Sequence, residues 1–156
     1  VKGLYALRNF AILDEKNEYL VKANSYWFLL NTETGRPMRI MESDTAPYGE
    51  FSPKLEMEDA GRKIQVPKEM EETGRMVVMK HLLDTNLHVN NAQYVDIARE
   101  LLPAGTEISE IRAEYRKAAV LGDEIVIRSA REGKSYLVSL CNPDGDVFAN
   151  IELKEM

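Results

Sequence analysis

The chain has 156 residues, of which 44% are hydrophobic and 29% charged, which is typical of a globular protein. No apolar run approaches the roughly 20 residues that a membrane-spanning helix needs, so we predict no membrane span. Its formal net charge is −6, and Lys and Arg are scattered among the acids, which excludes the basic stripe typical of nucleic-acid-binding proteins. A single cysteine, Cys141, excludes an internal disulfide and indicates a reducing compartment, so we expect a cytoplasmic protein.

The first part of the chain is rich in aromatic and β-branched residues, which is typical of strands. Three strands are predicted there, at residues 4–13, 19–30 and 36–41. The turn before the third strand contains Gly35, which is placed to adopt a positive φ in a bulged hairpin. Because three strands without a covering helix cannot bury one face of their sheet, we expect the helix to lie upstream or to come from another subunit.

Residues 42–71 differ in character, since they contain several prolines, many acids and few apolar pairs. This composition indicates a connector between two domains. A short helix is predicted around residues 67–73, with Pro67 in its first turn.

From residue 72 onward the pattern indicates a compact α+β domain. Met76 to Met79 form a short apolar strand, and residues 81–86 form a polar loop. A helix is predicted over residues 90–102, with an apolar face formed by Tyr94, Ile97, Ala98 and Leu101.

Four antiparallel strands follow this helix, at about residues 108–118, 124–130, 134–141 and 147–155. The last strand alternates with period two, with Val147, Ala149, Ile151 and Leu153 on one face.

Polar side chains gather immediately before the predicted helix. Asp84, Asn86 and His88 follow one another at every second residue, and in an extended loop this spacing places all three side chains on one side. Asp84 or His88 could activate a water molecule, Asn86 could orient a partner, and the backbone N–H groups that begin the helix could stabilise an oxyanion. The set suits the hydrolysis of an acyl compound.

Each of these residues also has an ordinary structural interpretation. Asp84 alone is typical of a turn, and a single His in a loop is usually a surface residue. Asn90, which precedes the helix, is typical of an N-cap. Spacing alone therefore leaves both interpretations open.

The segment Asp84-x-Asn-x-His-Val-Asn-Asn-x-x-Tyr94 resembles the motif of acyl-ACP thioesterases, the plant and bacterial family with two hot-dog domains. Supporting similarities are found in four short segments: Ser25-Tyr-Trp27, Thr34-Gly-Arg-Pro37, Glu114-Tyr-Arg-Lys117 and Gly122-Asp123. The resemblance covers most of residues 4–156.

This resemblance implies an α+β hot-dog fold, in which an antiparallel sheet wraps around a central helix. Residues 1–41 would be the C-terminal strands of a truncated first hot dog, residues 42–71 the linker, and residues 72–156 a complete second hot dog. We expect roughly a hundred further residues or fewer upstream in the full-length protein, where the two hot dogs would pair within the chain or in a homo-oligomer.

The resemblance also implies a reaction, the hydrolysis of fatty acyl-[acyl carrier protein] to free fatty acid, which terminates fatty acid synthesis. Its active-site residues would be Asp84, Asn86 and His88, its partner an acyl carrier protein, and no cofactor would be needed. The sequence contains no motif typical of a metal site.

The chain departs from the family pattern after the Glu114-Tyr-Arg-Lys117 segment. Where the family often has a catalytic Glu, this sequence has Ala118, and where plant members have a Cys, it has Ala119. Cys141 lies in a predicted strand and is interpreted as a small buried hydrophobic residue.

The other candidate residues are interpreted as structural. His81 is expected at the surface, Trp27 in a core, and Met76 and Met79 among core strand residues.

Two other functions stay open. One is an acyl-CoA thioesterase of the wider hot-dog superfamily, which would prefer CoA over the carrier protein. The other is a non-catalytic acyl-binding domain, which the missing acid at Ala118 favours.

Overall fold

The structure is a computed structural model that describes residues 3–49 and 53–156. The chain forms two compact units, Val1–Gly61 and Arg62–Met156. The boundary between them falls inside segment 42–71. The assignment of this segment as a linker stays a prediction, as do the two hot-dog domain assignments.

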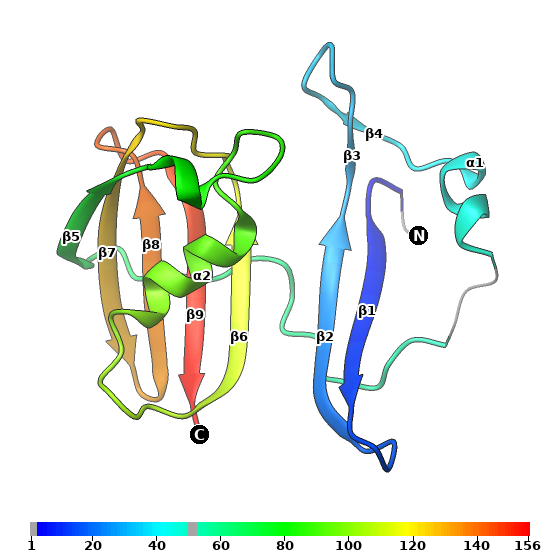
Figure 1. The fold of residues 1–156 in the computed structure, drawn as a ribbon, viewed down its shortest axis with the longest axis horizontal. Helices are drawn as coiled ribbons and strands as arrows, with labels where there is room; N and C mark the ends of the chain where they lie inside the picture. The colour runs from blue at the N-terminus through cyan, green and yellow to red at the C-terminus, as the bar shows by residue number, and fades with distance from the viewer. Residues whose placement is uncertain (1–2, 50–52) are drawn as a thin grey trace. The chain divides into compact units, whose positions relative to one another are not determined.

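The first unit consists mainly of a hairpin, in which β1 (Ala6–Leu13) pairs antiparallel with β2 (Tyr19–Trp27) (Figure 1). The strand predicted over residues 19–30 divides at Phe28, and the short β3 (Leu29–Leu30) pairs with β4 (Pro37–Met38). Gly35 in the intervening turn has a φ of +65°, as the sequence predicts. The return strand is shorter than predicted, since its pairing with β3 ends at Met38.

The remainder of this unit is largely irregular and its hairpin is poorly covered. α1 (Glu42–Thr45) and η1 (Ala46–Tyr48) are single turns within the predicted linker. Several large hydrophobic side chains of the hairpin are exposed: Phe10, Ile12, Val21 and Trp27. A two-stranded hairpin is marginally stable in water, so these side chains require a further layer that the described residues of this unit do not provide.

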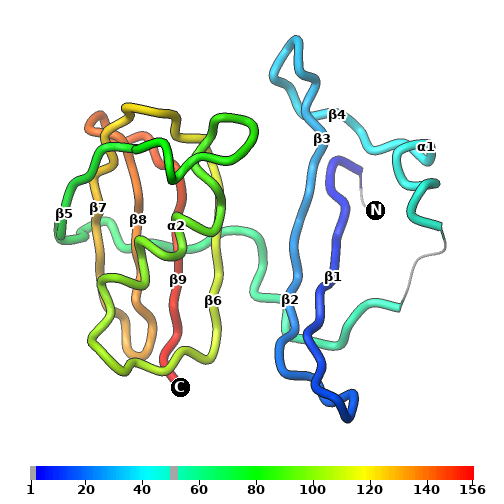
Figure 2. The backbone as a smooth tube through the Cα atoms, viewed as in Figure 1, coloured from blue at the N-terminus to red at the C-terminus, as the bar shows by residue number. Residues whose placement is uncertain are grey.

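The second unit is a five-stranded antiparallel sheet of order β5-β7-β8-β9-β6, with α2 lying across one face (Figures 1 and 2). Its elements are β5 (Glu71–Val77), η2 (Lys80–Leu82), α2 (Asn91–Arg99), β6 (Ile108–Tyr115), β7 (Glu124–Glu132), β8 (Ser135–Cys141) and β9 (Val147–Glu155). The helix predicted around residues 67–73 is wrong, because Glu71 onward pairs with β7 and sheet pairing overrides the local preference.

The core lies between α2 and the sheet. Tyr94 and Ala98 are buried, and Ile97 and Leu101 pack against the same cluster, which confirms the predicted apolar face of the helix. The face is apolar at helical spacing because residues three and four apart lie on one side of a helix.

β9 follows the predicted alternation from Ala149 to Leu153 but departs from it at its start. Phe148 is only 1% exposed, because an irregularity in the pairing with β8 leaves Phe148 as an extra residue between the Val147 and Ala149 pairings. Both Phe148 and Ala149 therefore belong to the core.

Asn150 is buried as well, on the opposite face of the sheet. Segment 62–70 passes behind the sheet, away from α2 (Figure 1). Its backbone is fixed by two side chains of β6: Arg112 donates to the Lys63 carbonyl at 3.1 Å, and Glu114 accepts the Ile64 N–H at 3.2 Å. A segment predicted as part of a linker thus covers a polar sheet face.

Among the described residues, no helix has the length and apolar character needed to cross a membrane.

Candidate functional site

Asp84 and His88 close a tight turn directly before α2. The Asp84 N–H donates to the His88 carbonyl at 2.8 Å, and the Leu87 N–H donates to the Asp84 carbonyl at 3.1 Å. The Asp84 carboxylate accepts the N–H of Asn86 at 2.8 Å and that of His88 at 3.2 Å. A bridge between Leu83 and Val89 flanks the turn.

The loop is therefore not the extended segment that the sequence suggested. Leu87 has a φ of +61°, a left-handed conformation that is unfavourable for a non-glycine residue and reverses the chain within the motif. Asp84 is half-buried, whereas Asn86 and His88 are exposed. What brings Asp84 and His88 together is the turn, not alternation along a strand.

A second turn in the same chain has the same hydrogen-bond pattern. The Asp14 carboxylate accepts the N–H groups of Lys16 and Glu18, both at 2.8 Å, and Asn17 has a φ of +64°. Carboxylate bonding of this kind is therefore a structural device in this chain. The Asp84 turn differs in the amide and imidazole side chains that it carries at Asn86 and His88.

The environment of Asp84 favours its ionised form. Desolvation raises the pKa of this carboxyl, but hydrogen bonds from the backbone N–H groups of His88 and Asn86, a bond from the Asn86 side chain and the charge of His88 together lower the pKa below its ordinary value of 3.8. Asp84 is thus an anion at neutral pH, and the charge of His88 contributes to keeping it ionised.

We expect the carboxylate bonds of the turn to weaken as Asp84 is protonated in acid. A carboxyl whose pKa is lowered on folding contributes stability above its unfolded pKa and loses it as the pH falls through the folded value. The amide NMR signals of Asn86 and His88 should therefore titrate with a midpoint below 3.8. The Asp84→Asn variant should show no such step, and a wild-type midpoint above the ordinary value would contradict this account of the turn.

The start of α2 is capped by Asn90. Its side chain accepts the Ala92 N–H at 2.9 Å, and its carbonyl accepts the Gln93 N–H at 2.9 Å, so the N-cap prediction is confirmed. These bonds correct the expectation of several available donors, because Asn90 already uses two N–H groups of the first turn.

A short backbone segment, residues 118–120, lies beside the turn. His88 forms an antiparallel bridge with Val120, and the Val89 N–H donates to the Ala119 carbonyl at 2.9 Å. Ala119 is fully buried and Ala118 is exposed. The position where the family resemblance implies a Glu is therefore adjacent to the turn in this unit, and it holds a methyl group.

Tyr94 connects this segment with α2, and Tyr115 connects the end of β6 with α2. The Tyr94 hydroxyl accepts the Ala119 N–H at 3.0 Å, and the Tyr115 hydroxyl donates to the Asn91 carbonyl at 3.0 Å. Burial raises the pKa of Tyr94, the Ala119 N–H lowers it, and the charge of Asp123 raises it, with a net increase that keeps the phenol neutral. The sequence predicts Tyr94 on the apolar face of the helix, and its hydrogen bond to Ala119 has no signal along the chain.

The structure confirms the expected burial or exposure of some of the remaining candidate residues but not of others. Cys141 is 2% exposed, Met76 packs against the core, and His81 is exposed in η2. Trp27 and Met79 were expected in cores, but they are 50% and 55% exposed within their units. The part of the chain that the structure describes contains no group of three or more His, Cys, Asp and Glu residues placed to hold a metal ion.

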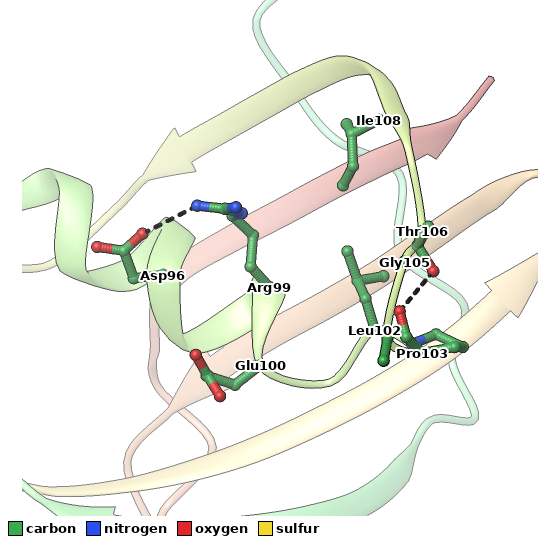
Figure 3. Close-up of a pocket in the computed structure, with 9 residues that line it drawn as sticks. Asp96, Arg99, Glu100, Leu102, Pro103, Gly105, Thr106 and Ile108 are labelled. Atoms are coloured by element: carbon green, nitrogen blue, oxygen red, sulfur yellow. Dashed lines mark hydrogen bonds and ion pairs between the residues drawn. The ribbon is translucent and has the colours of Figure 1, made fainter.

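A cavity of about 490 Å³ lies at the other end of α2 from the turn (Figure 3). It is lined by Asp96, Arg99, Glu100, Leu102, Pro103, Ala104, Gly105, Thr106 and Ile108. Asp96 and Arg99, three residues apart on α2, form an ion pair at 3.6 Å. None of Asp84, Asn86 and His88 lines this cavity, so we place the candidate site at the turn.

Comparisons with known proteins agree with the motif. The family described as the acyl-ACP thioesterase N-terminal domain matches residues 1–48, and the acyl-ACP thioesterase C-terminal domain matches residues 65–153. No curated protein sequence matches the chain.

Two solved structures show the same fold. An acyl-ACP thioesterase from Bacteroides thetaiotaomicron is 19% identical with a TM-score of 0.83, and the match covers 100% of this chain and 65% of that one. The 12:0-ACP thioesterase from Umbellularia californica is 22% identical with a TM-score of 0.84, covering 100% of this chain and 64% of that one. The chain thus spans less than two thirds of either relative, and the α+β hot-dog prediction is confirmed. Because the C-terminal family domain covers more than half of the sequence, this chain belongs to the acyl-ACP thioesterase family.

Proposed function

We propose that this protein hydrolyses the thioester of fatty acyl-[acyl carrier protein] and releases free fatty acid, which ends chain elongation. The observation that carries the proposal is the Asp84–His88 turn at the capped start of α2, within the segment that matches the thioesterase C-terminal domain. The carrier protein is the proposed partner and no cofactor is required.

In the proposed reaction, water attacks the thioester carbonyl and forms a tetrahedral oxyanion. His88 accepts the proton of the attacking water, and the adjacent Asp84 anion stabilises the resulting imidazolium. The exposed Asn86 side chain lies in the same turn and would donate to the thioester oxygen or orient the water. Breaking the C–S bond returns the proton to the leaving sulfur, so acyl carrier protein thioester and water give fatty acid and the free carrier thiol.

We infer further that the reaction takes place in the cytoplasm, since the lone Cys141 is a buried free thiol.

Pairing of two hot dogs, within the full-length chain or between copies, is the proposed assembly. It would supply a layer for the apolar hairpin of the first unit.

The test is thiol release by the full-length enzyme from a panel of acyl carrier protein thioesters and the matching acyl-CoA thioesters. We expect release that is faster with the carrier protein at equal acyl chain length. Release confined to acyl-CoA would instead identify a CoA thioesterase, and release from neither carrier would reject hydrolysis.

One observation favours a second function. Ala118 leaves the family's acid position filled by a methyl group, which suits an acyl-binding domain without turnover. Tight binding of acyl carrier protein, measured by calorimetry, with no thiol release would favour this function. In that case, Ala118→Glu should introduce a measurable release of thiol.

A further inference from the structure

Tyr94 links the helix that follows the turn to the segment beside the turn. It lies in α2 and is 2% exposed, and its hydroxyl accepts the N–H of Ala119 at 3.0 Å. Ala119 is fully buried as well. A buried N–H that loses its partner is costly, so this hydrogen bond strongly constrains where the backbone at Ala119 lies.

The backbone carbonyl of Ala119 and the neighbouring Val120 contact the residues of the turn. The Ala119 carbonyl accepts the Val89 N–H at 2.9 Å, and Val120 forms the bridge with His88. In this hydrogen-bonding pattern the bridged residues are a non-hydrogen-bonded antiparallel pair, whose side chains lie close together on the same face. The position of the His88 side chain therefore depends on where Ala119 and Val120 are held.

Together, the chain and these hydrogen bonds form a closed loop that contains His88, Tyr94 and Ala119. The chain runs from His88 through the Asn90 cap into α2, returns through the Tyr94 hydroxyl to Ala119, and reaches Val89 again through the Ala119 carbonyl. Asp123 supports the same segment, since its carboxylate accepts the Val120 N–H at 2.9 Å.

We propose that Tyr94 is a positioning residue for His88, acting through its hydrogen bond to the Ala119 backbone. This inference rests on the proposed thioester hydrolysis for its kinetic consequence, but the positioning itself can be measured without turnover. Tyr94 does not face the reacting atoms, because its hydroxyl is buried against Ala119.

Tyr115, which is 42% exposed, provides a control for the loss of a tyrosine hydrogen bond near the start of α2. It is the ring neighbour of Tyr94, with centroids 5.9 Å apart, and its hydroxyl also makes one bond to backbone, to the Asn91 carbonyl at 3.0 Å. That bond joins β6 to the start of α2 and does not reach residues 118–120. Removing either hydroxyl costs one tyrosine hydrogen bond at the same helix, but only Tyr94→Phe releases Ala119.

The experiment compares wild type, Tyr94→Phe and Tyr115→Phe in the full-length enzyme with acyl carrier protein thioester. Small displacements of catalytic groups cost up to about 100-fold in rate, so we expect kcat to fall by roughly 10-fold or more in Tyr94→Phe. KM should stay near the wild-type value, since the substrate contacts are intact. Tyr115→Phe should retain kcat even if its melting temperature falls equally.

A second readout separates positioning from the proposed function. In NMR spectra, the His88 imidazole and amide resonances should shift in Tyr94→Phe and remain in place in Tyr115→Phe. In the wild type, the Ala119 amide should exchange with solvent only on unfolding of the unit. Rapid Ala119 exchange, unshifted His88 signals, or equal loss of kcat in both variants would overturn the proposal. If the wild type releases no thiol but the His88 signals shift as expected, the proposed function fails while the positioning role stands.

Discussion

Replacing Asp84 with Asn, or His88 with Ala, is expected to lower kcat/KM for acyl carrier protein thioester by about 100-fold or more, the usual contribution of a general acid–base group. In Asp84→Asn, the new amide keeps an oxygen that can accept the backbone N–H groups of the turn, so the loss would report the missing charge beside His88. His88→Ala leaves the backbone bridge to Val120 available and removes only the imidazole. Steady-state thiol release measures both variants.

Asp14→Asn is the matched control for these variants. Asp14 makes the same pair of carboxylate bonds in a turn with the same positive φ at its fourth residue, but Lys16 and Glu18 stand in place of Asn86 and His88. We expect Asp14→Asn to leave the rate unchanged. Equal activity of Asp84→Asn and wild type would show that the motif turn is structural, like its counterpart.

Phe148→Ala is expected to reduce the free energy of unfolding of the second unit by about 3–5 kcal/mol. Phe148 is among the largest fully buried side chains, with 1% of its surface exposed, and its removal leaves a cavity between the sheet and α2. Denaturant titration followed by circular dichroism measures the loss.

Val77→Ala, on edge strand β5, is the control for this core variant. Val77 is 55% exposed, so its truncation should change stability by no more than about 0.5 kcal/mol. A Phe148→Ala loss as small as that of Val77→Ala would show that the irregularity in β9 does not place Phe148 in the core. The activity of Phe148→Ala should fall only in proportion to the fraction of protein that is unfolded.

The predictions from sequence were accurate where neighbouring residues decide the outcome. The α2 face that contains Tyr94 and Ala98 was found because helical spacing repeats along the chain, and the Asn90 cap was found because capping is a contact between near neighbours. Gly35 was assigned its positive φ for the same local reason.

The errors arose where distant segments meet. Residues 67–73 were predicted as helical, yet Glu71 onward forms a strand because β7 offers it a pairing edge. The sequence also contains no sign that Asn150 is buried on the sheet face away from α2, where Glu114 binds the backbone of Ile64. Neither outcome is encoded by a local pattern, since both depend on segments that lie far apart in the sequence.

The sequence by itself determined which residues make up the candidate site, because the Asp84–Tyr94 motif lies within one short continuous segment and matches the thioesterase family. Only the tertiary structure decided how these residues are held. The Asp84 turn replaces the expected extended loop, Asn90 occupies two of the donors expected for an oxyanion, and the Tyr94 hydroxyl reaches Ala119. Hydrogen bonds across the core depend on where the sheet places each strand, and spacing along one segment carries no information about that placement.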